Sequence, residues 1–149
     1  MSARSQVPMN IAVLGAGAWG TGMALQLARR HAVRTWAHSG EMADALRKNR
    51  VNARYLPGVP LPDTVQVCAG TAEAHDVADC DLVLVACPVA GLRDQLIALR
   101  GFRQPVVWLC KGFEAVQQGA PYGLLPHEVL AQVASELQAG VLSGPSFAQ

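Results

Sequence analysis

The chain has 149 residues, of which 51% are hydrophobic and 15% are charged, and its formal net charge is +1. This length favours a single domain with an ordinary buried core, and the apolar content excludes a disordered chain. The small net charge gives no reason to expect nucleic acid or an anionic membrane surface as a partner, and the apolar runs are too short to span a membrane.

The first predicted element is a strand over residues 9–14. Residues 1–8 before it are polar, and we expect them to form a flexible tail. Residues 15–20 then form the pattern G-x-G-x-x-G, and a helix-like stretch follows over residues 21–30. In this setting the first glycine permits a sharp turn, the second lets a pyrophosphate approach the backbone, and the third lets the helix pack closely on the strand. The segment predicts a dinucleotide site at Gly15, Gly17 and Gly20; the alternative is a tight turn without a ligand.

Apolar runs and helical patterns alternate along the rest of the chain. Residues 82–87 are continuously apolar, as expected of a parallel strand covered on both faces. Ser39 is suited to cap the helix that follows it, and Gly140 to end the last helix, in which apolar residues recur every four positions from Leu125 to Leu137. Strands are predicted at 9–14, 33–37, 65–68, 82–87, 106–110 and 140–143, and helices at 21–30, 41–49, 90–99 and 125–137.

This alternation predicts a Rossmann-type doubly wound α/β fold, a mainly parallel sheet with helices on both faces, over residues 9–149. Ligands of such sheets bind outside the carboxyl ends of the strands. One proline-rich loop, residues 55–62, interrupts the alternation. The loops selected as candidate sites are residues 15–20, 87–91 and 110–112, together with the segment after residue 143.

The four cysteines form no C-x-x-C pair and have no histidine at a zinc-ligand spacing. We therefore expect no metal site and reduced thiols in a cytoplasmic protein. Two of these thiols end apolar runs, where a cysteine serves as a small hydrophobic side chain. The cysteines are Cys68, Cys80, Cys87 and Cys110.

The end of the second strand bears on the choice between NAD and NADP. NAD sites usually carry an acidic residue there to bind the ribose 2′-hydroxyl, and residues 36–39 contain none. Without a carboxylate a 2′-phosphate is not repelled, so the sequence favours NADP or dual use, with His38 and Ser39 as its contacts. Arg30 and Arg34 are less well placed but add positive charge. The alternative is that His38 is only a surface histidine.

Three further segments carry a resemblance to one family. Residues 52–58 fit N-x-x-Y-L-P-G, residues 108–114 are a strand followed by K-G-F-E, and residues 143–148 read S-G-P-S-F-A. Together with the glycine turn, they closely resemble the amino-terminal part of bacterial NAD(P)-dependent glycerol-3-phosphate dehydrogenase. That family interconverts dihydroxyacetone phosphate and sn-glycerol 3-phosphate by hydride transfer, for phospholipid synthesis.

The resemblance implies a role for each matched residue. Ala18 and Trp19 would lie along the cofactor phosphates, and His38 at the adenine ribose. Lys111 would contact the substrate and lie near the nicotinamide. The remaining implied contacts are Gly144 and Ser146 for the substrate and Ala148 for the cofactor.

A role for Lys111 in ligand binding is also supported by its position, because it directly follows a predicted central strand. An ammonium group there could attract a substrate phosphate or polarise a carbonyl. Taken alone, a lysine in a K-G turn is more often a solvated loop charge. Cys87 and Pro88 end another strand beside the predicted cofactor cleft, where we expect a steric role in shaping the nicotinamide pocket.

The resembled enzymes are about twice as long, and the lysine that exchanges the carbonyl proton lies in their carboxyl-terminal helical domain. We therefore expect a truncated form that holds the cofactor and no catalytic residue, inactive by itself. An uncovered sheet edge and apolar face predict self-association, with a homodimer as one form.

Two other functions remain consistent with the sequence. One is a related dehydrogenase of the ketopantoate reductase or 6-phosphogluconate type, which the segments at 52–58 and 143–148 argue against. The other is a non-catalytic dinucleotide sensor, which a chain of this length would suit.

Overall fold

A computed structural model describes residues 7–143, in which six strands form one sheet and two short strands form a separate hairpin. In chain order the elements are β1 (Asn10–Leu14), α1 (Ala18–Leu27), β2 (Ala32–Ala37), α2 (Gly40–Asn49), β3 (Val51–Asn52), β4 (Leu56–Pro60), β5 (Gln66–Ala69), β6 (Leu82–Val85), α3 (Val89–Ala98), β7 (Val106–Trp108), α4 (Pro126–Val133) and β8 (Ala139–Val141).

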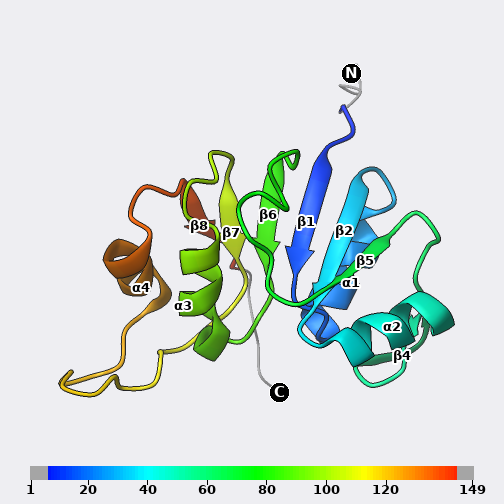
Figure 1. The fold of residues 1–149 in the computed structure, drawn as a ribbon. Helices are drawn as coiled ribbons and strands as arrows, with labels where there is room; N and C mark the ends of the chain where they lie inside the picture. The colour runs from blue at the N-terminus through cyan, green and yellow to red at the C-terminus, as the bar shows by residue number, and fades with distance from the viewer. Residues whose placement is uncertain (1–6, 144–149) are drawn as a thin grey trace.

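The large sheet has the strand order β5-β2-β1-β6-β7-β8, and every neighbouring pair in it is parallel (Figure 1). From β1 the chain proceeds outward through β2 to β5, and it then returns to place β6 on the other side of β1. The direction of winding therefore reverses between β1 and β6. This is the predicted Rossmann-type doubly wound fold. Folds of this kind bind ligands at the carboxyl ends of the strands where the winding reverses, which here are β1 and β6.

Both faces of the sheet are buried. Successive side chains of a strand point to opposite faces, and on each face they pack into an apolar cluster. In β1, Ala12 and Leu14 pack into one apolar cluster, whereas Ile11 and Val13 pack into another. The first cluster contains the apolar side chains of α3 and α4, and the second those of α1 and α2. Figure 1 shows these two helix pairs on opposite sides of the sheet, which explains the continuous apolar runs of the central strands.

The predicted boundaries need small corrections at the carboxyl edge. β6, β7 and β8 each end two residues earlier than the apolar runs indicated, and α1 begins at Ala18 instead of Thr21. The chain beyond β6 still makes one ladder bond, since the Ala86 N–H donates to the Leu14 carbonyl at 2.7 Å. Past β6 and β7 the apolar side chains remain partly buried, as at Cys87 and Cys110, so hydrophobicity does not mark the end of these strands.

The prediction for the last helix was wrong at its carboxyl end. α4 ends at Val133, because Ala134 leaves the helical region with φ −155° and ψ 48°. Leu137 is buried although it lies outside the helix, so its four-residue spacing reflects burial and not helical structure. Gly140, predicted as a helix stop, pairs with Val107 within β8.

The proline-rich segment is also more regular than predicted. β3 and β4 form an antiparallel hairpin with a register shift between Val51 and Asn52. The hairpin lies beside α2 near the carboxyl edge of the sheet (Figure 1). It therefore brings the segment over residues 52–58 to the same edge as the glycine turn.

Candidate dinucleotide-binding site

The glycine turn after β1 is packed against the end of β6. Gly15 has φ +118°, and a Cβ there would lie 2.8 Å from the Ala86 carbonyl and 3.0 Å from the Cys87 amide nitrogen. A Cβ on Gly20 would lie only 1.9 Å from the Gly15 carbonyl oxygen. These two glycines are required by the packing of the protein itself. Gly17 is different, because a Cβ on it would meet nothing within 4 Å.

The start of α1 provides backbone donors without a side-chain acceptor. Gly17 is the N-cap residue, no side chain among residues 7–143 caps the helix, and its first turn contains no acidic residue. The first four N–H groups of a helix have no intrahelical acceptor, and the helix dipole is positive at this end. Ala18 and Trp19, the first two residues of the helix, are exposed, with Trp19 81% accessible. This end of α1 can therefore accept a phosphate group.

Asn52, at the end of β3 in the hairpin, holds this turn in place by hydrogen bonds. Its side-chain amide donates to the Ala16 carbonyl at 2.8 Å and to the Thr21 hydroxyl at 2.7 Å. Its Oδ1 accepts the Tyr55 N–H at 3.2 Å. In the sequence, Asn52 stands out only as the first residue of the N-x-x-Y-L-P-G segment. One sequence signal could have identified Asn52. Asparagine often caps a helix, and no helix is predicted to start after residue 52, so its side chain needs another partner.

The carboxyl end of β2 places His38 on the surface, directly after Ala37. The prediction that Ser39 caps α2 is confirmed, since its hydroxyl oxygen accepts the Met42 N–H at 3.2 Å. The hydroxyl proton of Ser39 can still be donated to a ligand. No acidic side chain lies in β2 or at these two positions, although Glu41 follows in the first turn of α2.

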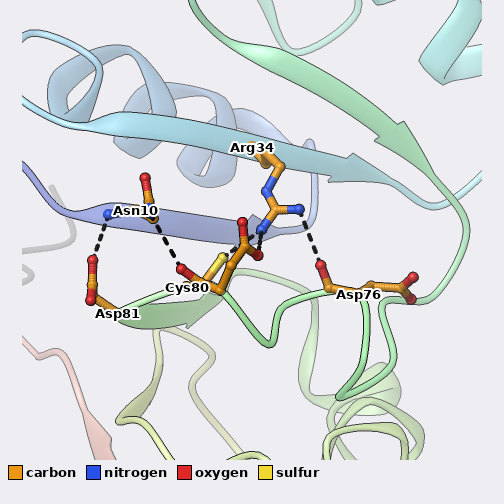
Figure 2. Close-up of polar contacts among 6 residues, drawn as sticks. Asn10, Arg34, Asp76, Cys80 and Asp81 are labelled. Atoms are coloured by element: carbon orange, nitrogen blue, oxygen red, sulfur yellow. Dashed lines mark hydrogen bonds and ion pairs between the residues drawn. The ribbon is translucent and has the colours of Figure 1, made fainter.

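The added positive charge predicted from Arg34 and Arg30 is wrong for this edge. The guanidinium of Arg34 donates to the Asp76 carbonyl at 3.1 Å and to Cys80 Sγ at 3.0 Å, and it forms an ion pair with Asp79 (Figure 2). Asp79 lies three residues before the start of β6, so this cluster lies at the amino-terminal edge of the sheet. Arg30 follows α1 and precedes β2, at that same edge.

A hollow of about 160 Å³ lies beside this cluster, lined by residues that include Asn10, Arg34 and Asp79. It is remote from the glycine turn, and its polar groups already bind other groups of the protein. Besides the Arg34 contacts, the backbone N–H of Asn10 donates to the Asp81 carboxylate (Figure 2). We therefore place the candidate site at the carboxyl edge and not in this hollow, because no described side chain caps the start of α1 there.

Lys111 is exposed in the loop after β7, followed by Gly112 with φ +92°. The loop is anchored three residues further on by Glu114, whose carboxylate is buried. Its two oxygens accept from Arg93 of α3 at 2.6 and 2.8 Å, and the same guanidinium donates to Gln132 of α4 at 2.9 Å. The hydrogen bonds from Arg93 hold the pKa of Glu114 below its ordinary value. Arg93 and Gln132 were missed from the sequence, where they read as ordinary surface residues.

Cys87 lies two residues beyond the end of β6 and directly precedes Pro88, the N-cap of α3. Burial, reinforced by the neighbouring Cys110, raises the pKa of the Cys87 thiol to about 11. A thiol with this pKa is protonated at neutral pH, so Cys87 is not activated as a nucleophile.

Three predicted contacts, Gly144, Ser146 and Ala148, lie outside the described residues, and the structure does not address them. Within residues 7–143 no group of three histidine, cysteine or acidic side chains is arranged to hold a metal ion. In the same range no helix is long and apolar enough to cross a membrane.

Comparison with known proteins gives a consistent result. A family model described as the NAD-dependent glycerol-3-phosphate dehydrogenase N-terminus matches residues 10–149. The chain is 55% identical over 145 residues to a glycerol-3-phosphate dehydrogenase [NAD(P)+] of Variovorax paradoxus, covering 95% of this chain and 42% of the relative.

Solved structures agree with the sequence comparison. The glycerol-3-phosphate dehydrogenase of Coxiella burnetii superposes with a TM-score of 0.77 at 28% identity, over 95% of this chain and 42% of that one. The Saccharomyces cerevisiae glycerol-3-phosphate dehydrogenase superposes with a TM-score of 0.70 at 26% identity, over 94% of this chain and 43% of that one. The chain thus spans less than half the length of these relatives.

Proposed function

This chain belongs to the NAD-dependent glycerol-3-phosphate dehydrogenase family, and we propose that it forms the NAD(P)-binding part of an enzyme that interconverts dihydroxyacetone phosphate and sn-glycerol 3-phosphate. The observation that carries the proposal is the open, uncapped start of α1 behind Gly17. A dinucleotide supplies the hydride donor or acceptor of this reaction when it is bound.

The residues at the carboxyl edge fit such a cofactor. The backbone of Gly17, Ala18 and Trp19 would bind the pyrophosphate, since their N–H groups begin α1 and no side chain occupies the space beside Gly17. Gly15 and Gly20 would serve by shaping the turn. Ala148 is a further proposed contact, on the resemblance alone.

On the substrate side, Lys111 would hold the phosphate of a three-carbon substrate or polarise its carbonyl, close to the nicotinamide. The Arg93–Glu114 pair supports this role because it fixes the loop that carries the lysine. Gly144 and Ser146 would complete the substrate contacts. Cys87 would limit the space for the nicotinamide ring.

For the nucleotide preference, we propose NADP(H) or dual use, with NADPH slightly favoured. The support is the absence of an acidic side chain at positions 36–39 and the free hydroxyl proton of Ser39. His38→Asp places a carboxylate where it would repel a 2′-phosphate and accept from a 2′-hydroxyl, so the NADPH-to-NADH affinity ratio should fall by about tenfold. An unchanged ratio would remove His38 from the site.

The experiment that tests the function is calorimetric titration of the 149-residue chain with NADPH and with NADH. Binding of either supports the proposal, and binding of neither would overturn it. We expect no turnover of dihydroxyacetone phosphate by this chain, because none of its residues is assigned the proton transfer. Measurable turnover would contradict that assignment.

A cytoplasmic location and a homodimer are further parts of the proposal. The dimer is supported by exposed apolar side chains, among them Phe113, Tyr122 and Val141, and by β8 as an outer strand of the sheet. Sedimentation at high concentration should show self-association, and a clean monomer would contradict it. A dinucleotide sensor without catalysis is the second candidate, but family membership favours the enzyme.

A further inference from the structure

Asn52 is a buried polar residue whose side chain is fully engaged. It is 2% exposed, and both N–H groups of its amide and its oxygen have partners. Leaving a buried amide without such partners is costly, so its orientation is strongly determined. Its partners belong to two different parts of the molecule, namely the glycine turn with α1 and the tip of the hairpin.

The bond to Ala16 determines the direction of the next N–H group. The Ala16 carbonyl and the Gly17 N–H belong to one planar peptide, and no cis peptide occurs in the described part of the chain. In a planar trans peptide the C=O and N–H bonds point in opposite directions. Because Asn52 holds the Ala16 carbonyl toward the protein, the Gly17 N–H points away from Asn52.

The second bond of Asn52 ties the same peptide to the helix that follows it. Thr21, which accepts that bond, is 3% exposed in the first turns of α1. The Thr21 N–H also donates to the Gly17 carbonyl at 2.9 Å, which closes the first turn of α1. One side chain from β3 therefore fixes both the peptide before Gly17 and the turn after it.

We propose that Asn52 is a positioning residue for the cofactor: by holding the Ala16 carbonyl, it presents the Gly17 N–H and the start of α1 to the pyrophosphate. This inference rests on the proposed function and gives the segment over residues 52–58 a role in cofactor binding that acts through the turn. It also links the hairpin, through the Tyr55 N–H, to the shape of the cofactor cradle.

The test compares Asn52→Ala with Gln95→Ala. Gln95 is a matched control because its buried side-chain amide donates to a backbone carbonyl, that of Ala72, at the same 2.8 Å, but on α3. Each folded variant is titrated with NADPH, and the amide signals of residues 15–21 are followed by NMR. Asn52→Ala should weaken NADPH binding by about tenfold or more and reduce the shift of the Gly17 amide on binding, whereas Gln95→Ala should change neither.

If Asn52→Ala does not fold, Thr21→Val removes one partner of the amide, together with the 3.5 Å bond from the Thr21 hydroxyl to the Ala16 carbonyl, while keeping the side-chain shape. Thr21→Ser restores the hydroxyl. Weakened binding in Thr21→Val with recovery in Thr21→Ser supports the proposal. Unchanged NADPH affinity in Asn52→Ala or Thr21→Val, or an equal loss in Gln95→Ala, would overturn it. Failure of the unmodified chain to bind NADPH or NADH would instead count against the proposed function.

Discussion

The starts of α1 and α2 lie at the same edge of the sheet, after neighbouring strands, and they differ in how their backbone donors are used. At α2 the Ser39 side chain accepts an N–H group and Glu41 adds negative charge in the first turn. At α1 the N-cap is Gly17, its first turn contains no acid, and no capping side chain is found in the described part of the chain. The chain thus stabilises α2 with its own side chains and leaves α1 available for an anion.

Polar groups on the other half of the sheet are also used in bonds within the protein. α4 has Glu128, whose carboxylate accepts the Leu125 N–H at 2.8 Å, and the loop before α4 is held by the Arg93–Glu114 pair. These polar groups are occupied by structural bonds. The difference between the two kinds of helix start predicts which substitutions affect stability and which affect ligand binding.

The largest expected effect is that of Gly20→Ala. A Cβ 1.9 Å from the Gly15 carbonyl oxygen forces the helix away from the strand, and we expect a loss of more than about 3 kcal/mol in the free energy of unfolding by urea. Gly22→Ala is the matched control on the same helix. Its Cβ meets nothing within 4 Å, so stability should rise by about 0.5–1 kcal/mol. Equal stability of the two variants would contradict the close packing of the turn.

The second largest effect on stability is expected at the Arg93–Glu114 pair, whose polar groups are used in structural hydrogen bonds. Arg93→Ala leaves a buried carboxylate without its partner, and the free energy of unfolding at pH 7 should fall by about 2 kcal/mol. NADPH affinity should change less than in the glycine-turn variants. Substitution of the exposed Arg103 by alanine is the control and should change stability little.

The pH dependence of that loss has a defined sign. The folded-state pKa of Glu114 is lowered by Arg93. The pair therefore contributes its full stability above the ordinary glutamate pKa and loses it as the pH falls through the lowered value. Urea unfolding should show the difference between Arg93→Ala and the unmodified chain shrinking below about pH 4. A difference that grows on acidification would contradict this account.

Gly17→Ala separates ligand binding from stability. The new methyl group enters the space proposed for the pyrophosphate, so NADPH and NADH affinities measured by calorimetry should both fall by about tenfold or more. Because nothing within 4 Å opposes the methyl group, the free energy of unfolding should fall by less than about 1 kcal/mol. Unchanged affinities would mean that the pyrophosphate does not approach Gly17.

The smallest effect is expected at the capped helix. Ser39→Ala removes the acceptor of the Met42 N–H and should lower the free energy of unfolding by about 1 kcal/mol. The affinity for NADH, which has no 2′-phosphate to contact Ser39, should stay the same. Ser39→Thr preserves a hydroxyl acceptor and should recover most of the lost stability. A fall in NADH affinity would show that the two helix starts are not independent.

Much of the fold could be predicted from local sequence. Strands covered on both faces need continuous apolar side chains, and β1 and β6 have them. The positions of strand ends and of the end of α4 could not be predicted, because Leu137 is buried in a turn as it would be in a helix. Burial sets the apolar pattern, and several backbone shapes satisfy it.

The candidate site divides in the same way. The glycine pattern identified the turn, because the backbone passes so close to Gly15 and Gly20 that neither position has room for a Cβ. The partners of charged and amide side chains could not be read from spacing. Arg34 was assigned charge near the cofactor, yet it pairs with Asp79 at the opposite edge.

The sequence by itself determined the turn at residues 15–20, the alternation of strands and helices and the family, because these depend on local sterics, on apolar periodicity and on motifs in a fixed order. Only the tertiary structure decided which polar groups are free. Asn52 reaches a carbonyl 36 positions away and Glu114 pairs with a residue 21 positions away. Such bonds depend on how elements pack, and their result is that the start of α1 keeps its donors.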